Sequence, residues 1–183
     1  MTYLVPAQAG AQFISVFVYA LVAKWYVAPW LSTRKRADAI IALLWVHVFR
    51  YVALMTFSAQ RDGFPISDEE LFNIVIGDVA GAALALAAIV ALRYRARLGI
   101  ALTWLLAVET IFDTVTNIRS GVREHLMGAA GGTTWLILVF YVPAVVVSII
   151  FLIWQLSTRR GERLDPTIHG EPRQRRIAVP TTS

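Results

Sequence analysis

The sequence has 183 residues, of which 57% are hydrophobic and only 16% are charged. Ordinary soluble domains have roughly 45–50% apolar and about 25% charged residues, so this composition argues against a soluble enzyme and against a disordered chain. The net charge of +5 does not point to nucleic acid, because the basic residues stand in short runs between apolar stretches, as in membrane proteins. The absence of cysteine excludes disulfides, thiolate nucleophiles and thiolate metal sites.

Five apolar stretches are each long enough for a helix of about 20 residues that crosses a bilayer. In chain order they are residues 11–31, 37–58, 71–92, 99–118 and 133–156. The first is not typical of a cleavable signal peptide, because it begins without charge and its basic run follows it. The sequence therefore predicts an all-α fold, a polytopic bundle of five transmembrane helices over residues 1–158. A mobile basic tail over residues 159–183 is expected to follow.

Three local signals refine these spans. Residues 67–70 (Ser-Asp-Glu-Glu) are typical of a helix start, with acids at the positive end of the helix dipole. Pro143 should bend the fifth span or free one of its carbonyls. The third span is rich in small residues, with Gly77 and Gly81 at GxxxG spacing, which favours close packing within the bundle over a dimer interface. A homo-oligomer or a membrane partner on this face stays open.

The distribution of Lys and Arg predicts the orientation. Twelve of them fall on one side of the five spans and three on the other. Because translocation of Lys and Arg is disfavoured, the carboxyl end is expected in the cytoplasm and the amino end outside. The expected location is a cytoplasmic membrane, with the lipid bilayer as partner and no nucleic acid.

Apart from Lys24, which can snorkel to the inner end of the first span, five ionisable residues lie deep inside the predicted spans, where a charge at the helix centre costs at least ~2.5–3.5 kcal/mol. Depth estimated from the helical rise of ~1.5 Å per residue places all five in one layer, from the midplane outward. They are His47, Arg50, Asp78, Glu109 and Asp113.

The spacing of these residues predicts that they converge. Glu109, Asp113 and Asn117 recur at i, i+4 and i+8 on one face, and His47 and Arg50 share a face of the second span. If all three carboxyls ionise against one arginine, a surplus of two negative charges remains in a low-dielectric site. A bound proton, a charged His47, a bound cation or water from outside would each remove it.

Tyr141 and Ser148 on the fifth span are candidates to line the same cavity. His47, Asp78, Glu109 and Asp113 could together bind a divalent ion, although a structural pairing of Arg50 is equally compatible with the pattern. One histidine supports no haem site, and no cofactor is implied.

The chain resembles a widespread group of small bacterial five-span membrane proteins, and the resemblance covers spans two to five. It implies the fold and no activity. The residues that carry it are 44–51 (LWVHVFRY), Gly77 and Asp78, 109–117, and 141–143 (Tyr-Val-Pro). The chain departs from the pattern of that group at two places. An amide or small residue is expected at the position of Glu109, and a histidine is expected near the position of Ser148. A fainter similarity, on His47, Glu109 and Pro143, is to the emopamil-binding and sigma-2-receptor (EXPERA-type) bundle, whose members hold sterol-like ligands.

Three functions remain open from the sequence. The ionisable layer could bind or conduct a proton, a cation or a small polar ligand, as intramembrane charges usually do. The charges could instead only fix helix packing in a structural or accessory subunit. The third is an intramembrane enzyme on a lipid or isoprenoid, with Glu109 or Asp113 as acid and His47 as base. The sequence contains no diphosphate-binding DDxxD motif and no cofactor fingerprint that would name a reaction.

Overall fold

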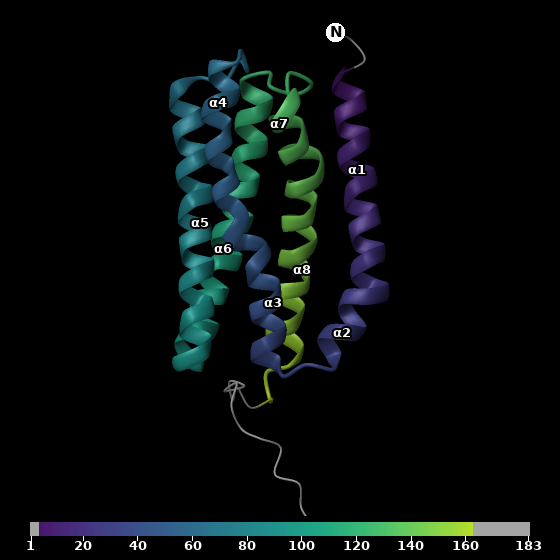
Figure 1. Ribbon diagram of the computed structural model, residues 1–183, viewed down its shortest axis with the longest axis vertical. Helices are drawn as coiled ribbons and strands as arrows, with labels where there is room; N and C mark the ends of the chain where they lie inside the picture. Colours follow the sequence, from purple (N-terminus) through teal and green to yellow (C-terminus); the bar gives the residue numbers. More distant parts are fainter. Residues whose placement is uncertain (1–3, 163–183) are drawn as a thin grey trace, which may run out of the picture.

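The computed structural model describes residues 4–162, which are mostly helical, with no strand in that range (Figure 1). Five continuous helical stretches are long and apolar enough to cross a membrane: Leu4–Ser32, Arg36–Arg61, Asp68–Tyr94, Ala96–Arg123 and Gly132–Thr158. This confirms an all-α chain with five candidate spans. Each predicted span lies within one of these stretches, which are all longer than predicted.

Three of the five stretches are divided into segments, and two are uninterrupted. The elements are α1 (Leu4–Val22), η1 (Ala23–Val27), α2 (Ala28–Ser32), α3 (Arg36–Val48), η2 (Phe49–Leu54), α4 (Met55–Arg61), α5 (Asp68–Tyr94), α6 (Ala96–Arg123), α7 (Gly132–Leu136), η3 (Ile137–Tyr141) and α8 (Val142–Thr158). The α2–α3 turn, the α5–α6 break at Arg95 and the end of α8 lie at one end of the bundle, here the basic end (Figure 1). The α4–α5 and α6–α7 loops lie at the other, the loop end.

The interruptions near prolines have a common physical cause. The segments η1 and η3 are π-helical, and each ends two residues before a proline, Pro29 or Pro143. Proline has no N–H, and its ring clashes with the carbonyl four residues earlier, so the preceding turn widens to avoid it. In η3 the Val142 N–H reaches back five residues to the Ile137 carbonyl. The predicted disturbance at Pro143 is confirmed.

That π-helical register leaves one carbonyl without a helical donor. The next donor in the register would be residue 143, which is proline, and the Leu138 carbonyl accepts instead from Gln12 Nε2 at 3.1 Å. One turn earlier on α1, Gln8 Oε1 accepts from the backbone N–H of Gly128 at 2.9 Å. These two glutamines fasten α1 to the rest of the bundle near the loop end.

The start of α5 confirms the helix-start signal read from residues 67–70. The Ser67 hydroxyl accepts a bond from the Glu70 N–H at 3.3 Å, the geometry of an N-cap. In a capping box the third helical residue would bond back to the cap N–H. Here Glu124, from the loop after α6, accepts from both the Ser67 N–H and hydroxyl. Glu70 instead pairs with Arg123, so the loop end is joined across helices.

The apolar core lies between α3, α5, α6 and α8, and α1 stands at its periphery against α8 (Figure 1). Core residues that are fully buried include Ile40 and Leu44 from α3, Ala85 from α5, Leu106 from α6 and Leu152 from α8. Small residues of α5 let α3 and α6 pack closely on it.

At the basic end two arginines join neighbouring stretches through backbone carbonyls. Arg36 Nη2 donates to the Leu156 carbonyl at 3.1 Å. Arg159 donates to the carbonyls of Leu31 at 3.3 Å and Arg34 at 2.8 Å, tying the end of α8 to the α2–α3 turn. Arg159, the first residue of the predicted mobile tail, thus contacts the bundle, and residues 163–183 of that tail lie outside the described residues.

Candidate functional site: the Arg50 cluster

Arg50 is supplied by the 3₁₀ segment η2, which interrupts the second long stretch near its middle. The tighter pitch of η2 displaces α4 from the axis of α3, and the bend between them is visible in Figure 1. The guanidinium points into the bundle, and only 2% of the side chain is exposed. A charge buried this deeply requires partners.

Three carboxylates from two helices surround the guanidinium. Arg50 Nε lies 2.8 Å from Asp78 Oδ1 of α5, Nη1 lies 2.7 Å from Glu109 Oε2, and Nη2 lies 2.6 Å from Asp113 Oδ2, both of α6. Each guanidinium nitrogen thus bonds to a different carboxylate. The carboxylate side chains are 22%, 24% and 14% exposed, so the anions are more accessible than the cation. We call Arg50, Asp78, Glu109 and Asp113 the Arg50 cluster.

Two neutral side chains complete the bonding. Thr110 Oγ1 accepts from Arg50 Nη1 at 3.0 Å and lies 3.2 Å from Glu109 Oε2. Asn117 Nδ2 donates to Asp113 Oδ2 at 3.1 Å, across one turn of α6. Predicted site residue Asn117 therefore supports the orientation of a carboxylate in the cluster.

The GxxxG glycines of α5 make room for this cluster. A Cβ atom placed on Gly81 would lie 2.3 Å from Arg50 Nη1, and one on Gly77 would lie 2.3 Å from Asp113 Oδ1. Both distances are far inside van der Waals contact, so only glycine fits without displacement. The pair faces charges of the same chain, which agrees with packing inside the bundle. A partner on the outward small residues of α5 (Ala80, Ala83 and Ala87) stays a prediction.

His47 shares the predicted layer but not its hydrogen bonds. Its side chain is fully buried, and neither ring nitrogen has a hydrogen-bond partner. A buried polar group without a partner is costly, so this imidazole is an exception that a protein ordinarily avoids. The structure places His47 one helical turn before Arg50 and outside the ion pairs.

Tyr141 is also near the centre of the bundle but binds backbone rather than carboxylate. Its hydroxyl donates to the Val46 carbonyl at 2.8 Å. Val46 lies near the junction of α3 and η2, where helical pairing changes from α to 3₁₀. The sequence had suggested that Ser148 and Tyr141 line one cavity, but Ser148 lines a pocket to which Tyr141 does not contribute. The Ser148 hydroxyl donates to the Leu43 carbonyl at 3.3 Å, within this apolar pocket.

The arrangement of the side chains does not support the divalent-metal interpretation. Within residues 4–162 no group of three or more His, Asp or Glu side chains is arranged to hold a metal ion. The carboxylates of the cluster face a guanidinium, and His47 does not join them. The proposed set of His47, Asp78, Glu109 and Asp113 is therefore not a divalent site in this structure.

Sequence reasoning missed Thr110 and the two glutamines of α1. Thr110 lies three residues before Asp113, a spacing that places both on one helix face, and that signal could have found it. Gln8 and Gln12 recur at i and i+4, but the stretch was read as apolar from residue 11, so Gln8 lay before the predicted start and Gln12 directly after it.

One family model matches the chain over residues 8–157, and its description is "Domain of unknown function (DUF8737)". No curated protein and no solved structure matches the chain. The matched region contains the whole Arg50 cluster and covers most of the five long stretches. The chain belongs to the DUF8737 family of domains of unknown function.

Proposed function

We propose that this is a multi-pass protein of a bacterial cytoplasmic membrane, with its amino end outside and its carboxyl end in the cytoplasm. Five long apolar helices support membrane insertion. The asymmetry of Lys and Arg supports the orientation, because the basic runs at 34–36, 93–97 and 159–160 all fall at the same end of the bundle.

Within that protein, the Arg50 cluster is a site that binds and releases protons or a small monovalent cation. The observation that carries this proposal is the pairing of one guanidinium with three carboxylates. If all four groups ionise, two negative charges are left over at close range in a low-dielectric environment, where like charges repel strongly. A bound proton or cation neutralises that surplus.

The arrangement also leaves somewhere for the proton or cation to bind. Arg50 contacts one oxygen of each carboxylate, so the second oxygens of Asp78, Glu109 and Asp113 are not engaged by it. These three side chains are partly exposed whereas Arg50 is buried, so an exchanging ion is proposed to bind at their second oxygens.

A structural role is the second candidate, and the saturation of Arg50 favours it. All three guanidinium nitrogens are bonded, and Gly77 and Gly81 fit closely against the cluster. Buried ion networks of this kind can serve to fix which helices pack together. The protein would then be an accessory subunit in which the charges specify register.

Infrared difference spectroscopy on the reconstituted protein tests the first candidate. We expect the absorption of a protonated carboxyl group at neutral pH, and we expect it to fall when the pH is raised or a monovalent cation is added. Asp78→Asn, Glu109→Gln and Asp113→Asn should each change this signal. Glu69→Gln, at an exposed acid of α5, is the matched control and should leave it unchanged. A wild-type protein with no such signal and no bound cation would overturn the proposal.

Replacement of the whole cluster tests the structural candidate. A variant with Arg50→Met, Asp78→Leu, Glu109→Leu and Asp113→Leu replaces the ion network with apolar packing. If the cluster only fixes packing, the variant folds with similar thermal stability and its host grows normally. A folded variant with a growth defect favours ion binding.

A further inference from the structure

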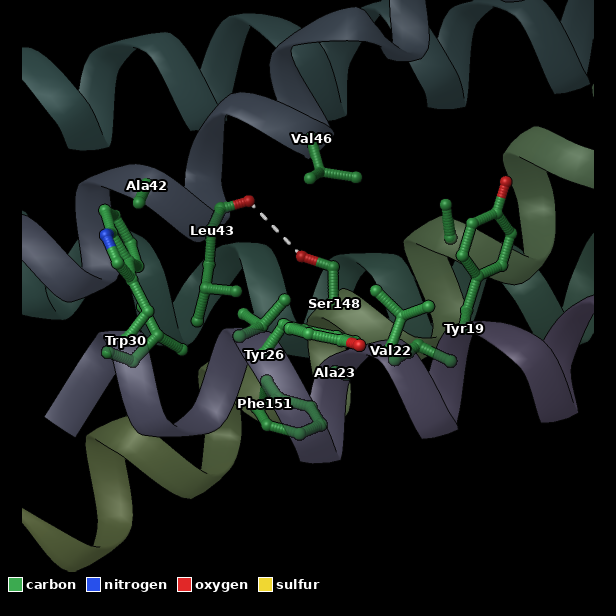
Figure 2. Close-up of a pocket in the computed structure, with 14 residues that line it drawn as sticks. Tyr19, Val22, Ala23, Tyr26, Trp30, Ala42, Leu43, Val46, Ser148 and Phe151 are labelled. Atoms are coloured by element: carbon green, nitrogen blue, oxygen red, sulfur yellow. Dashed lines mark hydrogen bonds between the residues drawn. The ribbon is translucent and has the colours of Figure 1, made fainter.

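A cavity whose lining differs chemically from the Arg50 cluster lies beside the peripheral first stretch. It is a groove of about 540 Å³ between α1, η1 and α2 on one side and α3 and α8 on the other (Figure 2). Its volume is within the ~300–1,000 Å³ range of small-molecule sites. We call it the α1–α2 groove, and its most prominent lining residues are Tyr26, Trp30, Leu43, Val147, Ser148 and Phe151.

The walls of the groove are almost entirely apolar. No charged residue lines it, and the Ser148 hydroxyl is already bonded to the Leu43 carbonyl, as the dashed line in Figure 2 shows. Tyr26 and Trp30 extend from the α1–α2 side. Such walls offer an occupant mainly dispersion and hydrophobic contacts, which favours a hydrocarbon chain over a polar metabolite.

The groove is held open by the way the first stretch is fastened. Gln8 and Gln12 tie α1 to the loop end, and Arg159 ties the Leu31 and Arg34 carbonyls at the basic end. Between these points α1 packs on α8, and the groove lies where the stretch passes α3. A helix fastened at both ends cannot close on α3 merely by tilting at one end.

Positive charge stands at the basic end of this apolar groove. The guanidinium of Arg34 lies over the ring of Trp30, a lining residue, at 4.8 Å from its centroid. Arg34 and Lys35 are exposed, whereas the neighbouring Arg36 is buried and bonded to the Leu156 carbonyl. An amphiphile with its chain in the groove would therefore meet two accessible cations at its polar end.

We propose that the α1–α2 groove is a binding site for an anionic phospholipid. One acyl chain lies in the groove between α1 and α3, and the phosphate of the head group is held by Arg34 and Lys35. The match of an apolar chain with the walls and of an anionic head group with the two cations selects this ligand over a neutral lipid. In the proposed orientation the cations face the leaflet that is rich in anionic lipid.

Native mass spectrometry of the full-length protein in detergent tests the proposal, with phosphatidylglycerol and phosphatidylcholine as probes. The wild type should retain one phosphatidylglycerol in preference to phosphatidylcholine. Ala42→Leu with Ala144→Leu fills the groove and should weaken retention of both lipids by about tenfold or more, since the chain loses its contacts. Ala83→Leu with Ala87→Leu, on the exposed side of α5, adds the same atoms outside the groove and should change nothing.

The head-group contacts are tested separately. Arg34→Gln with Lys35→Gln should abolish the preference for phosphatidylglycerol while phosphatidylcholine is retained as in the wild type. Arg93→Gln with Arg97→Gln removes two exposed cations elsewhere at the basic end and should keep the preference.

A measurement on the unfilled groove covers the case in which the filled variant does not fold. Trp30 fluorescence, taken as the difference between wild type and Trp30→Phe in vesicles, should be quenched more by brominated-chain phosphatidylglycerol than by brominated-chain phosphatidylcholine. Equal quenching, or equal lipid retention by the filled variant and its control, would overturn the proposal. Loss of a dimer from the filled variant without loss of lipid would also overturn it, because the occupant would then be a second copy of the chain.

Discussion

One guanidinium can serve three acids because its donors form a planar fork that points in three directions. Arg50 uses Nε, Nη1 and Nη2 on Asp78, Glu109 and Asp113, all within 2.8 Å. A lysine has a single nitrogen on a flexible stem and could not hold three carboxylates at these separate positions. The planar geometry of arginine therefore determines how the acids of two helices meet.

The close approach of Gly81 to Arg50 leads to a stability prediction. Gly81→Ala should destabilise the folded protein by about 1–3 kcal/mol, because its Cβ would overlap the guanidinium and force Arg50 from its partners. Gly121→Ala is the control, since nothing lies within 4 Å of a Cβ on this helical glycine, and it should be neutral or stabilising by up to about 1 kcal/mol. Thermal denaturation in detergent measures both. Equal effects would contradict the close fit.

At the residue scale, the sequence predicted which charges matter but not how they pair. The cost of burying Arg50, Asp78, Glu109 and Asp113 identified them, and the helical repeat placed Glu109 and Asp113 on one face. The exclusion of His47 from the ion pairs depends on the rotation of each helix about its axis. That rotation is set by side-chain packing, which the apolar period alone does not resolve.

At the element scale, interrupted helices supply Arg50 and Tyr141, whereas the three acids come from the uninterrupted α5 and α6. The 3₁₀ segment η2 carries Arg50, and the π segment η3 ends at Tyr141, whose hydroxyl binds the carbonyl of Val46. At η2 and at η3 a side chain from another stretch bonds to a backbone carbonyl, Tyr141 to that of Val46 and Gln12 to that of Leu138. Interruption and tertiary contact are therefore coupled in this bundle.

A double-mutant cycle tests that coupling at Pro143. Pro143→Ala restores an N–H and permits ordinary α-helical pairing, which gives the Leu138 carbonyl a donor within its own helix. Gln12→Leu should then destabilise the Pro143→Ala protein less than it destabilises the wild type, with a coupling of about 0.5–3 kcal/mol. Thermal melts of the four proteins give this number. Additive effects would show that Gln12 does not compensate for the proline.

The junction between α5 and the loop after α6 gives a pH prediction. Hydrogen bonds from the Ser67 hydroxyl and N–H hold the pKa of Glu124 below its ordinary value. A carboxyl with a depressed pKa in the folded state adds stability above its unfolded pKa, and this is lost as the pH falls through the folded pKa. The melting temperature of the wild type should therefore exceed that of Glu124→Gln at neutral pH. The difference should shrink in acid, and a constant difference would contradict the assignment.

The sequence predicted the number and type of the long elements better than their internal breaks. Apolar length and the Ser67 cap are local signals, and both were read correctly. Pro143 indicated the interruption at η3, but η2 contains neither proline nor glycine. Its 3₁₀ turn depends on contacts between helices, and these are not encoded in any window of the second stretch.

At the scale of the whole molecule, the two ends of the bundle differ in chemistry. The basic end carries Arg34, Lys35, Arg93, Arg95 and Arg97, all exposed, whereas exposed acids such as Asp62 and Glu69 lie at the loop end. This difference predicts the topology of the protein in a membrane, because basic loops are retained on the cytoplasmic side.

The absence of native cysteine makes the topology directly measurable. A single Asp62→Cys should react with a membrane-impermeant maleimide in intact cells, because the loop end is expected outside. A single Thr33→Cys, in the exposed turn at the basic end, should react only after the cells are permeabilised. The opposite pattern would reverse the proposed orientation.

The single residue Arg95 between α5 and α6 has a consequence for biogenesis. Two helices joined so tightly are expected to enter a bilayer together, as a hairpin. That hairpin contains all three acids of the cluster, whereas Arg50 belongs to a stretch synthesised earlier. In the proposed membrane orientation Arg50 would therefore precede these counter-ions into the bilayer, and entry of the hairpin would complete the cluster.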